Sequence, residues 1–80
     1  MSKILIVDDE VRIRDVVSEY AVAHGYQVKQ ASDGLEALKM IETEKFDLIL
    51  LDIMMPNLDG FSACKQIKAK QDVPVIMLSA

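Results

Sequence analysis

The chain has 80 residues, of which 51% are hydrophobic and 28% charged, so it can form one folded domain and is too apolar for intrinsic disorder. Nine basic and 13 acidic side chains give a formal charge of −4, which argues against direct binding to nucleic acid. The single cysteine cannot form an internal disulfide, and no apolar run reaches the ~20 residues of a membrane span. We therefore expect a cytoplasmic protein that makes no membrane contact.

The first two elements are predicted to be a buried strand and an amphipathic helix. Residues 4–7 form an uninterrupted apolar run, typical of a parallel strand buried on both faces, which stops abruptly at Asp8 and Asp9. A helix is predicted over residues 11–24, with Gly25 at the position that commonly follows a helix end. Its apolar stripe consists of Ile13, Val16, Val17, Tyr20 and Ala21.

The next strand and helix have clear boundaries. Residues 27–31 alternate polar and apolar side chains around Val28, which predicts a short strand at the edge of the sheet. Ser32 and Asp33 are good N-cap residues, and Glu36 follows Asp33 at the spacing of a capping box. The helix that follows is predicted to end near Thr43, with an apolar stripe of Leu35, Leu38 and Ile41.

The second half of the chain repeats this pattern. A second uninterrupted apolar run, residues 48–51, again ends in a carboxylate, Asp52. A loop with Pro56 leads to a helix whose stripe is Phe61, Cys64 and Ile67. Residues 75–78 form a fourth strand, followed by Ser79 and Ala80.

This alternation of strands and helices predicts an α/β fold with a parallel sheet and right-handed crossovers. Strands without polar alternation need neighbours on both sides, so residues 4–7 and 48–51 are expected to be central and adjacent, with residues 27–31 outside them. Ligands of such open sheets bind beyond the carboxyl ends of the strands.

Four polar side chains are predicted at that edge of the sheet, namely Asp8, Asp9, Asp52 and Ser79. Two carboxylates ~4 Å apart repel by about 4 kcal/mol at an effective dielectric near 20, so the cluster needs a cation or a shifted protonation. All-oxygen ligands favour Mg²⁺, which can assist phosphoryl transfer onto a carboxylate. Asp52 stands alone at its strand end and is the candidate acceptor, Asp8 and Asp9 are the candidate metal ligands, and Ser79 can donate a hydrogen bond to phosphoryl oxygens.

Simpler interpretations exist for the acidic residues. Asp8, Asp9 and Glu10 could merely cap the first helix, an interpretation that the matching Asp52 disfavours. Asp33 and Asp59 have no such partner and are predicted to be cap and turn residues only.

Taken together, these residues closely resemble the receiver domain of bacterial two-component response regulators. The motifs that carry the likeness are Asp8-Asp9, Asp52-Ile53-Met54-Met55-Pro56, Asp59-Gly60 and Ser79-Ala80. They are in register, and the likeness runs through the whole chain. It implies a flavodoxin-like parallel sheet with helices on both faces, in the strand order 2-1-3-4 for the strands present.

The resemblance also implies roles for individual residues. Asp52 would accept a phosphoryl group from a histidine kinase, so the chain would be a phosphoacceptor and not an enzyme. Asp9 would bind Mg²⁺ directly and Asp8 through water, with Asp52 and the backbone carbonyl of Met54 completing the metal site. Ser79 would be the switch hydroxyl.

One departure from the family pattern concerns the far end of the chain. Family members continue with a fourth helix, a fifth strand that bears a lysine, and a fifth helix, so we expect residues 1–80 to be a receiver truncated after its fourth strand, with impaired phosphorylation. Uncovered sheet faces and an open fourth strand predict a homodimer or a larger assembly.

Three other functions are alternatives. A nucleotide or flavin binder would need a phosphate-binding loop where Asp8, Asp9 and Glu10 stand, and is rejected. A phosphohydrolase with an aspartyl nucleophile would need a second carboxylate two positions beyond Asp52, where the sequence has Met54. A half-domain that assembles as a scaffold without signalling remains the main alternative.

Overall fold

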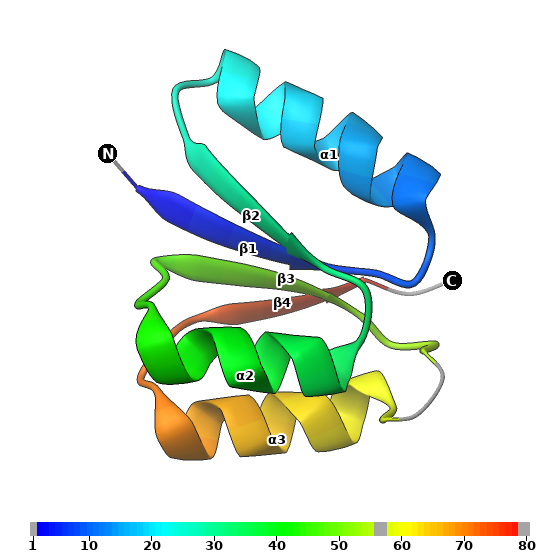
Figure 1. Ribbon diagram of the computed structural model, residues 1–80, viewed down its shortest axis with the longest axis vertical. Helices are drawn as coiled ribbons and strands as arrows, with labels where there is room; N and C mark the ends of the chain where they lie inside the picture. The colour runs from blue at the N-terminus through cyan, green and yellow to red at the C-terminus, as the bar shows by residue number, and fades with distance from the viewer. Residues whose placement is uncertain (1, 56–57, 79–80) are drawn as a thin grey trace.

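The structure, a computed structural model, describes residues 2–55 and 58–78 (Figure 1). Strands and helices alternate along the chain as predicted. They are β1 (Lys3–Val7), α1 (Val11–Ala23), β2 (Gln27–Ala31), α2 (Gly34–Thr43), β3 (Leu48–Asp52), α3 (Gly60–Lys70) and β4 (Val75–Leu78). Within the described residues, every helix is too short or too polar to span a lipid bilayer.

The four strands form one parallel sheet in the order β2-β1-β3-β4, which confirms the predicted fold class and the edge position of β2. Val7, the last residue of β1, pairs with Ala31 of β2 and with Leu51 of β3. Asp52 pairs with Leu78 of β4. The carboxyl ends of β1, β3 and β4 therefore lie side by side along one edge of the sheet.

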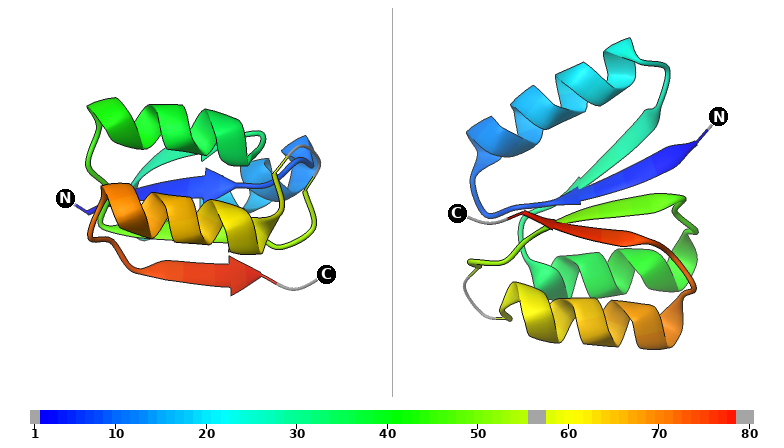
Figure 2. Two further views of the ribbon diagram at one scale, coloured as in Figure 1. Left: turned by 90° about the horizontal axis from the view of Figure 1, so that it is seen from below. Right: turned by 180° about the vertical axis from the view of Figure 1, so that it is seen from behind.

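Helices cover the two faces of the sheet unequally (Figures 1 and 2). α2 and α3 lie together on one face and α1 lies on the other. The larger core, on the α2 and α3 face, contains Leu5, Val7, Ile49, Leu51, Ala37, Leu38, Ile41, Ala63 and Ile67 among others. The smaller core consists of Ile4, Ile6 and Ala21, with Val17, Val28, Leu48 and Leu50 packed against it.

β1 is buried on both faces, as predicted, and β3 is central, as predicted, but one of its two faces is only half-buried. Leu48 and Leu50 are only half-buried, whereas Ile49 and Leu51, which alternate with them, are fully buried. Ile76 of β4, which pairs with Leu50, is 50% exposed. The reason is that α1 packs over β1 and β2, so the same face of β3 and β4 is uncovered in the described part of the chain.

The predicted stripe of α1 is also too wide. Ala21 is buried and Val17 lies against the smaller core, but Val16 is 66% exposed and Tyr20 is 70% exposed. A helix that crosses only two strands buries a narrow strip, and the flank turned away from them stays in solvent. The predicted stripes of α2 and α3 likewise each contain one exposed residue, Leu35 and Phe61 respectively.

The helix ends follow the sequence signals. Asp33 caps α2 by accepting a hydrogen bond from the Glu36 backbone N–H at 2.8 Å, and Asp59 caps α3 by accepting one from the Ser62 N–H at 3.0 Å. Gly25 follows α1 with a φ of 90°, a conformation that favours glycine. These residues therefore have the cap and turn roles predicted for them.

Candidate functional site

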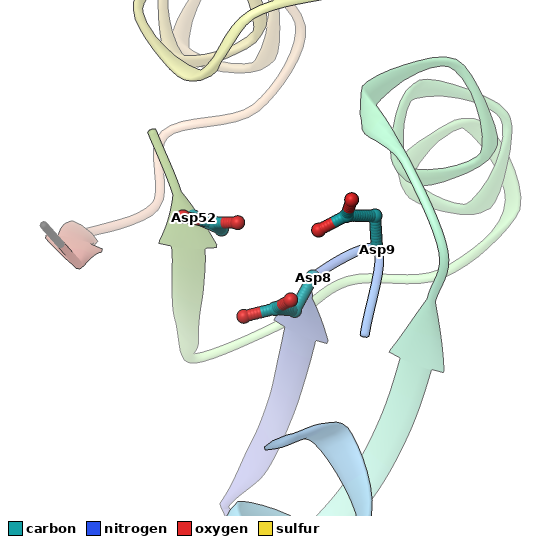
Figure 3. Close-up of side chains that lie close together, drawn as sticks. All are labelled: Asp8, Asp9 and Asp52. Carbon is teal, nitrogen blue, oxygen red and sulfur yellow. The ribbon is translucent and has the colours of Figure 1, made fainter. Parts of the chain in front are cut away.

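Three carboxylates meet at the carboxyl edge of the sheet, as the sequence predicts. Asp8 and Asp52 come from neighbouring strands whose register places them at the same level, and Asp9 follows Asp8 (Figure 3). Each of the three offers an oxygen atom, and these atoms all lie within 4.8 Å of one another. Unit charges at such distances repel by several kcal/mol at an effective dielectric near 20, so the cluster is a strong attractor for a cation.

Asp8 is the anchored member of the cluster. It is only 4% exposed. Its backbone N–H donates to the carbonyl of Ala31 at 3.2 Å, and its Oδ1 accepts from the backbone N–H of Glu10 at 2.9 Å. A third bond runs from Nη1 of Arg14 to the backbone carbonyl of Asp8 at 2.7 Å.

The environment of Asp8 disfavours its charged form. Burial raises the pKa of the Asp8 carboxyl above its ordinary value, and the hydrogen bond from Glu10 partly opposes that rise. The charges of Asp52 and Asp9 push the same pKa further upward. A bound divalent cation would reverse this balance by favouring the carboxylate.

The other two carboxylates are more accessible. Asp52 is half-buried, and its Oδ1 accepts a hydrogen bond from the backbone N–H of Met54 at 3.2 Å. Asp9 is exposed. The cluster thus combines one buried carboxylate, that of Asp8, with two that are more exposed to solvent.

A cavity of about 370 Å³ opens beside these carboxylates. It is lined by Asp8, Asp9, Glu10, Ile13, Asp52, Met54 and Leu78. No lysine or arginine is among these described lining residues, so no side-chain cation in the lining offsets the three negative charges. This volume is within the range of small-molecule sites and is sufficient for a hydrated ion with a phosphoryl group.

The idea that the acidic segment only caps α1 fails on geometry. Glu10 is the N-cap residue of α1, and its side chain makes no capping hydrogen bond. Asp8 instead accepts from the N–H of Glu10 itself, outside the helix. Asp8 and Asp9 therefore belong to the cluster with Asp52, and neither the Glu10 side chain nor the Asp8 side chain caps α1.

The donor set fits Mg²⁺. Carboxylate oxygens are hard ligands, and the three acidic residues include neither histidine nor cysteine, which zinc or copper sites use. Asp8, Asp9 and Asp52 can hold such an ion. Met54 lines the cavity, but a role for its carbonyl as a ligand stays a prediction, and Ser79 lies outside the described residues.

Two features of the site were missed from the sequence. Gly60 approaches the end of β3 so closely that a Cβ there would lie 2.5 Å from the backbone oxygen of Asp52 and 2.6 Å from the Cα of Ile53. Arg14 bonds to the carbonyl of Asp8 from the first turns of α1. The Asp59-Gly60 pair predicted a turn but not the close approach of Gly60 to β3. Nothing in the local sequence pattern indicated the hydrogen bond from Arg14 to Asp8.

Known proteins resemble this chain in sequence and in fold. The profile of the response regulator receiver domain matches residues 4–80. The alkaline phosphatase synthesis transcriptional regulatory protein PhoP of Bacillus subtilis (strain 168) is 51% identical over 79 residues, which cover 98% of this chain and 33% of that protein. The probable transcriptional regulator ycf27 of Guillardia theta is 50% identical over 78 residues, 98% of this chain and 31% of that protein. The chain thus spans about a third of the length of these curated relatives.

Two solved structures extend the comparison. The receiver domain of the Francisella response regulator 1452 is 40% identical with a TM-score of 0.93, over 100% of this chain and 67% of that one. The response regulator protein TrrA from Thermotoga maritima, in complex with Mg²⁺-BeF, is 40% identical with a TM-score of 0.95, over 100% of this chain and 70% of that one. Both superpose along the whole of this chain.

These likenesses favour the receiver interpretation. Receiver domains of response regulators are phosphorylated by histidine kinases, and the family therefore carries a phosphoacceptor role. The alternative of a half-domain scaffold without signalling activity has no support among the relatives. A profile match over nearly the whole length, joined to the same fold at 40% identity, shows that this chain belongs to the response regulator receiver domain family.

Proposed function

We propose that Asp52 accepts a phosphoryl group from a histidine kinase, at a site where Asp8, Asp9 and Asp52 hold Mg²⁺ and the Met54 carbonyl is a further ligand. The observation that carries the proposal is the convergence of three carboxylate oxygens within 4.8 Å beside a cavity of about 370 Å³. Bound there, Mg²⁺ would offset the negative charge of the carboxylates and of the arriving phosphoryl group.

The residues of the chain supply the rest of the reaction. Oδ1 of Asp52 accepts a hydrogen bond from the Met54 N–H, so the other carboxylate oxygen is the candidate nucleophile. That oxygen forms a bond to phosphorus while the bond from phosphorus to the imidazole nitrogen of the kinase histidine breaks. The products are an acyl phosphate on Asp52 and an unmodified kinase histidine, with Ser79 as the predicted hydroxyl donor to the phosphoryl oxygens.

The experiment incubates the chain with acetyl phosphate and MgCl₂ and measures its intact mass. We expect one phosphoryl adduct in the wild type, none in Asp52→Asn, and none in the wild type when Mg²⁺ is chelated. Asp59→Asn is the matched control, because that carboxylate only caps α3. An adduct that persists in Asp52→Asn, or its absence from the wild type at every Mg²⁺ concentration, would contradict the proposal.

We propose an acceptor and not a phosphohydrolase. The position two residues beyond Asp52 is Met54, which lines the cavity without offering a carboxylate as general acid. The chain should therefore not turn over a generic phosphomonoester, and Asp52-dependent multiple turnover would favour the phosphohydrolase instead. A cytoplasmic location and the absence of direct DNA binding stay predictions.

We also propose that the chain forms homo-oligomers through β4 and the uncovered face beside it. The support is the apolar strip of half-exposed side chains on β3 and β4, including Leu48, Leu50 and Ile76. Sedimentation equilibrium at roughly 100 μM should give a mass above that of a monomer, since mass action favours association at that concentration. A stable monomer there, or an Ile76→Lys variant that associates as well as the wild type, would contradict it.

A further inference from the structure

The side chain of Arg14, on α1, is hydrogen-bonded to the backbone of Asp8, the buried candidate metal ligand. Nη1 of Arg14 donates to the backbone carbonyl of Asp8 at 2.7 Å, and Nε of Arg14 donates to Oε1 of Gln30 at 3.0 Å. The guanidinium is planar, with its donors in a fixed fork, so two bonds in different directions fix its orientation. Arg14 thus links α1 to the end of β1 and to β2.

The partner of Arg14 is itself held in place. Nε2 of Gln30 donates to the hydroxyl of Ser18 at 2.8 Å, and Ser18 lies one helical turn beyond Arg14 on α1. Both ends of the Gln30 amide are therefore engaged by the same helix. The result is a closed chain of hydrogen bonds from α1 to β2 and back, with the carbonyl of Asp8 as its remaining acceptor.

The carbonyl of Asp8 lies where the strand pairing ends. Val7 is the last residue of β1 that pairs with β2 and β3, so the peptide that follows Asp8 is beyond the regular pairing of the sheet. The bond from Arg14 holds this peptide, and the N–H of Glu10 then reaches Oδ1 of Asp8. Together they fix the direction of the Asp8 carboxylate.

We propose that Arg14 is a positioning residue for the metal site, which fixes the main chain of Asp8 and thereby aims its carboxylate at the ion. This inference rests on the proposed function, because it supposes that the carboxylates bind Mg²⁺. Contacts that orient a ligand from outside the coordination shell commonly tune metal affinity.

The direction in which the Mg²⁺ affinity changes when Arg14 is replaced distinguishes a positioning role from a purely electrostatic one. Arg14 is a cation close to the site, so Coulomb's law alone predicts that its removal strengthens the binding of Mg²⁺. Loss of positioning predicts the opposite, a weaker affinity. Arg12 provides a matched control, because it is exposed, lies on the same first turns of α1 and carries the same charge.

The experiment measures the Mg²⁺ affinity of the wild type, Arg14→Met, Arg14→Lys and Arg12→Met by isothermal titration calorimetry. Methionine keeps an unbranched stem and removes the donors and the charge. We expect Arg14→Met to bind Mg²⁺ about 3–10-fold more weakly, below the 10–100-fold seen for direct partners of ligands. Arg14→Lys should also bind more weakly, because an ammonium group cannot reproduce the two-directional fork. Arg12→Met should bind as tightly as the wild type or slightly more tightly.

A second measurement does not depend on Mg²⁺. Amide hydrogen exchange by NMR in the metal-free protein reports on the Glu10 N–H, which donates to the Asp8 carboxylate. We expect several-fold faster exchange of this amide in Arg14→Met and no change in Arg12→Met, while circular dichroism verifies that both variants are folded.

The outcomes distinguish the two proposals. If the wild type does not bind Mg²⁺, the proposed function fails, and the exchange of the Glu10 amide alone decides whether Arg14 positions Asp8. A folded Arg14→Met variant that binds Mg²⁺ as tightly as the wild type, or more tightly, overturns the inference. So does an unchanged exchange rate of that amide.

Discussion

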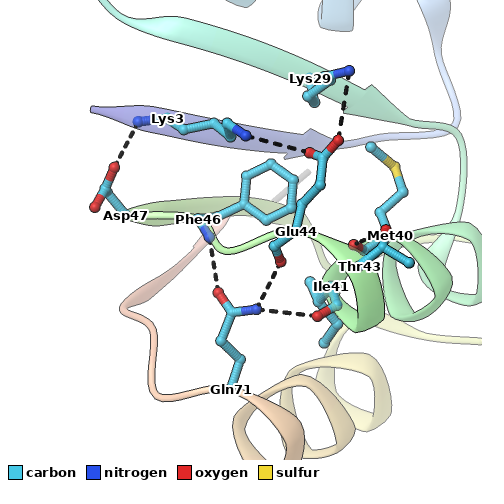
Figure 4. A network of polar contacts seen from close by, with 9 residues as sticks. All are labelled: Lys3, Lys29, Met40, Ile41, Thr43, Glu44, Phe46, Asp47 and Gln71. Carbon is cyan, nitrogen blue, oxygen red and sulfur yellow. Dashed lines mark hydrogen bonds and ion pairs between the residues drawn. The ribbon is translucent and has the colours of Figure 1, made fainter. Parts of the chain in front are cut away.

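At the amino end of the sheet, charged and polar groups are paired, whereas at the carboxyl end like charges are gathered (Figure 4 shows the former and Figure 3 the latter). The carboxylate of Glu44 lies between the ammonium groups of Lys3, at 3.7 Å, and Lys29, at 3.6 Å. The backbone N–H of Lys3 donates to Asp47 at 2.7 Å. At the opposite end, Asp8, Asp9 and Asp52 converge without such partners in the cavity lining.

Gln71 completes the contrast. Its side chain accepts a hydrogen bond from the Phe46 N–H at 2.8 Å and donates to the carbonyls of Ile41 and Glu44 at 3.3 and 3.1 Å. It thereby joins the end of α2, the start of β3 and the end of α3. The amino end is built to stabilise the fold, and the carboxyl end gives up stability to concentrate negative charge, as functional sites commonly do.

The largest effect should come from crowding the carboxyl end. Gly60→Ala would place a Cβ 2.5 Å from the backbone oxygen of Asp52, which cannot move as a side chain can. We expect a loss of about 2–3 kcal/mol in the free energy of unfolding, near the upper part of the range for overpacking, together with weaker Mg²⁺ binding. Urea unfolding and calorimetry measure both.

Gly34→Ala is the control for that substitution. Its Cβ would meet the Ala63 Cβ at 3.0 Å, a helix contact that can relax. It should therefore cost less stability and leave the Mg²⁺ affinity unchanged. If both variants lower the affinity equally, Gly60 has no particular role at the site.

A smaller effect is expected at the amino end. Gln71→Ala removes three hydrogen bonds and leaves part-buried backbone groups unpaired, which should lower the free energy of unfolding by about 2 kcal/mol. The Mg²⁺ affinity should not change, because the residue lies at the opposite end of the sheet. Gln66→Ala, at an exposed position of α3, is the control. A fall in Mg²⁺ affinity in Gln71→Ala would contradict the prediction that the amino end of the sheet does not affect the metal site.

The smallest effect has the opposite sign. Asp8→Asn removes one of the three like charges and can still accept from Glu10, so the metal-free protein should gain about 1 kcal/mol at neutral pH, a screened fraction of the Coulomb repulsion. The variant should lose most of its stabilisation by Mg²⁺. Equal stability of the variant and the wild type without metal would show that repulsion among the three carboxylates does not destabilise the fold.

Its pH dependence follows from the raised pKa of Asp8. A carboxyl whose pKa is higher in the folded state binds more protons there than in the unfolded chain, so stability falls as pH rises through the interval above 3.8, the ordinary value. Urea unfolding between acidic and neutral pH should show this loss in the metal-free wild type and less of it in Asp8→Asn.

Much of the fold could be predicted because its signals are local. Uninterrupted apolar runs marked β1 and β3 as central, the alternation of β2 marked it as an edge, and Asp33 and Asp59 marked helix starts through bonds to residues three positions on. The convergence of the three acidic residues followed from their places at strand ends. Parallel strands bring such ends to one edge whatever the details of packing.

Other features depend on how segments far apart in the sequence meet. The period of α1 allowed a wide apolar face, and only its position over β1 and β2 decided that Val17 and Ala21 are covered while Val16 and Tyr20 are not. The half-exposed side chains of β3 have the same origin. The composition of α1 and the spacing of its apolar residues would be the same whether the helix covered two strands or three, so the sequence could not predict which of these residues are buried.

The sequence by itself determined the elements, their order in the sheet and the acidic residues that meet at its edge, because these depend on periodicity, capping and strand ends. Only the tertiary structure decided that Arg14 holds the Asp8 carbonyl and that Gly60 presses against the backbone of Asp52. Both are contacts between segments, and their formation depends on angles and distances between elements that a linear pattern does not contain.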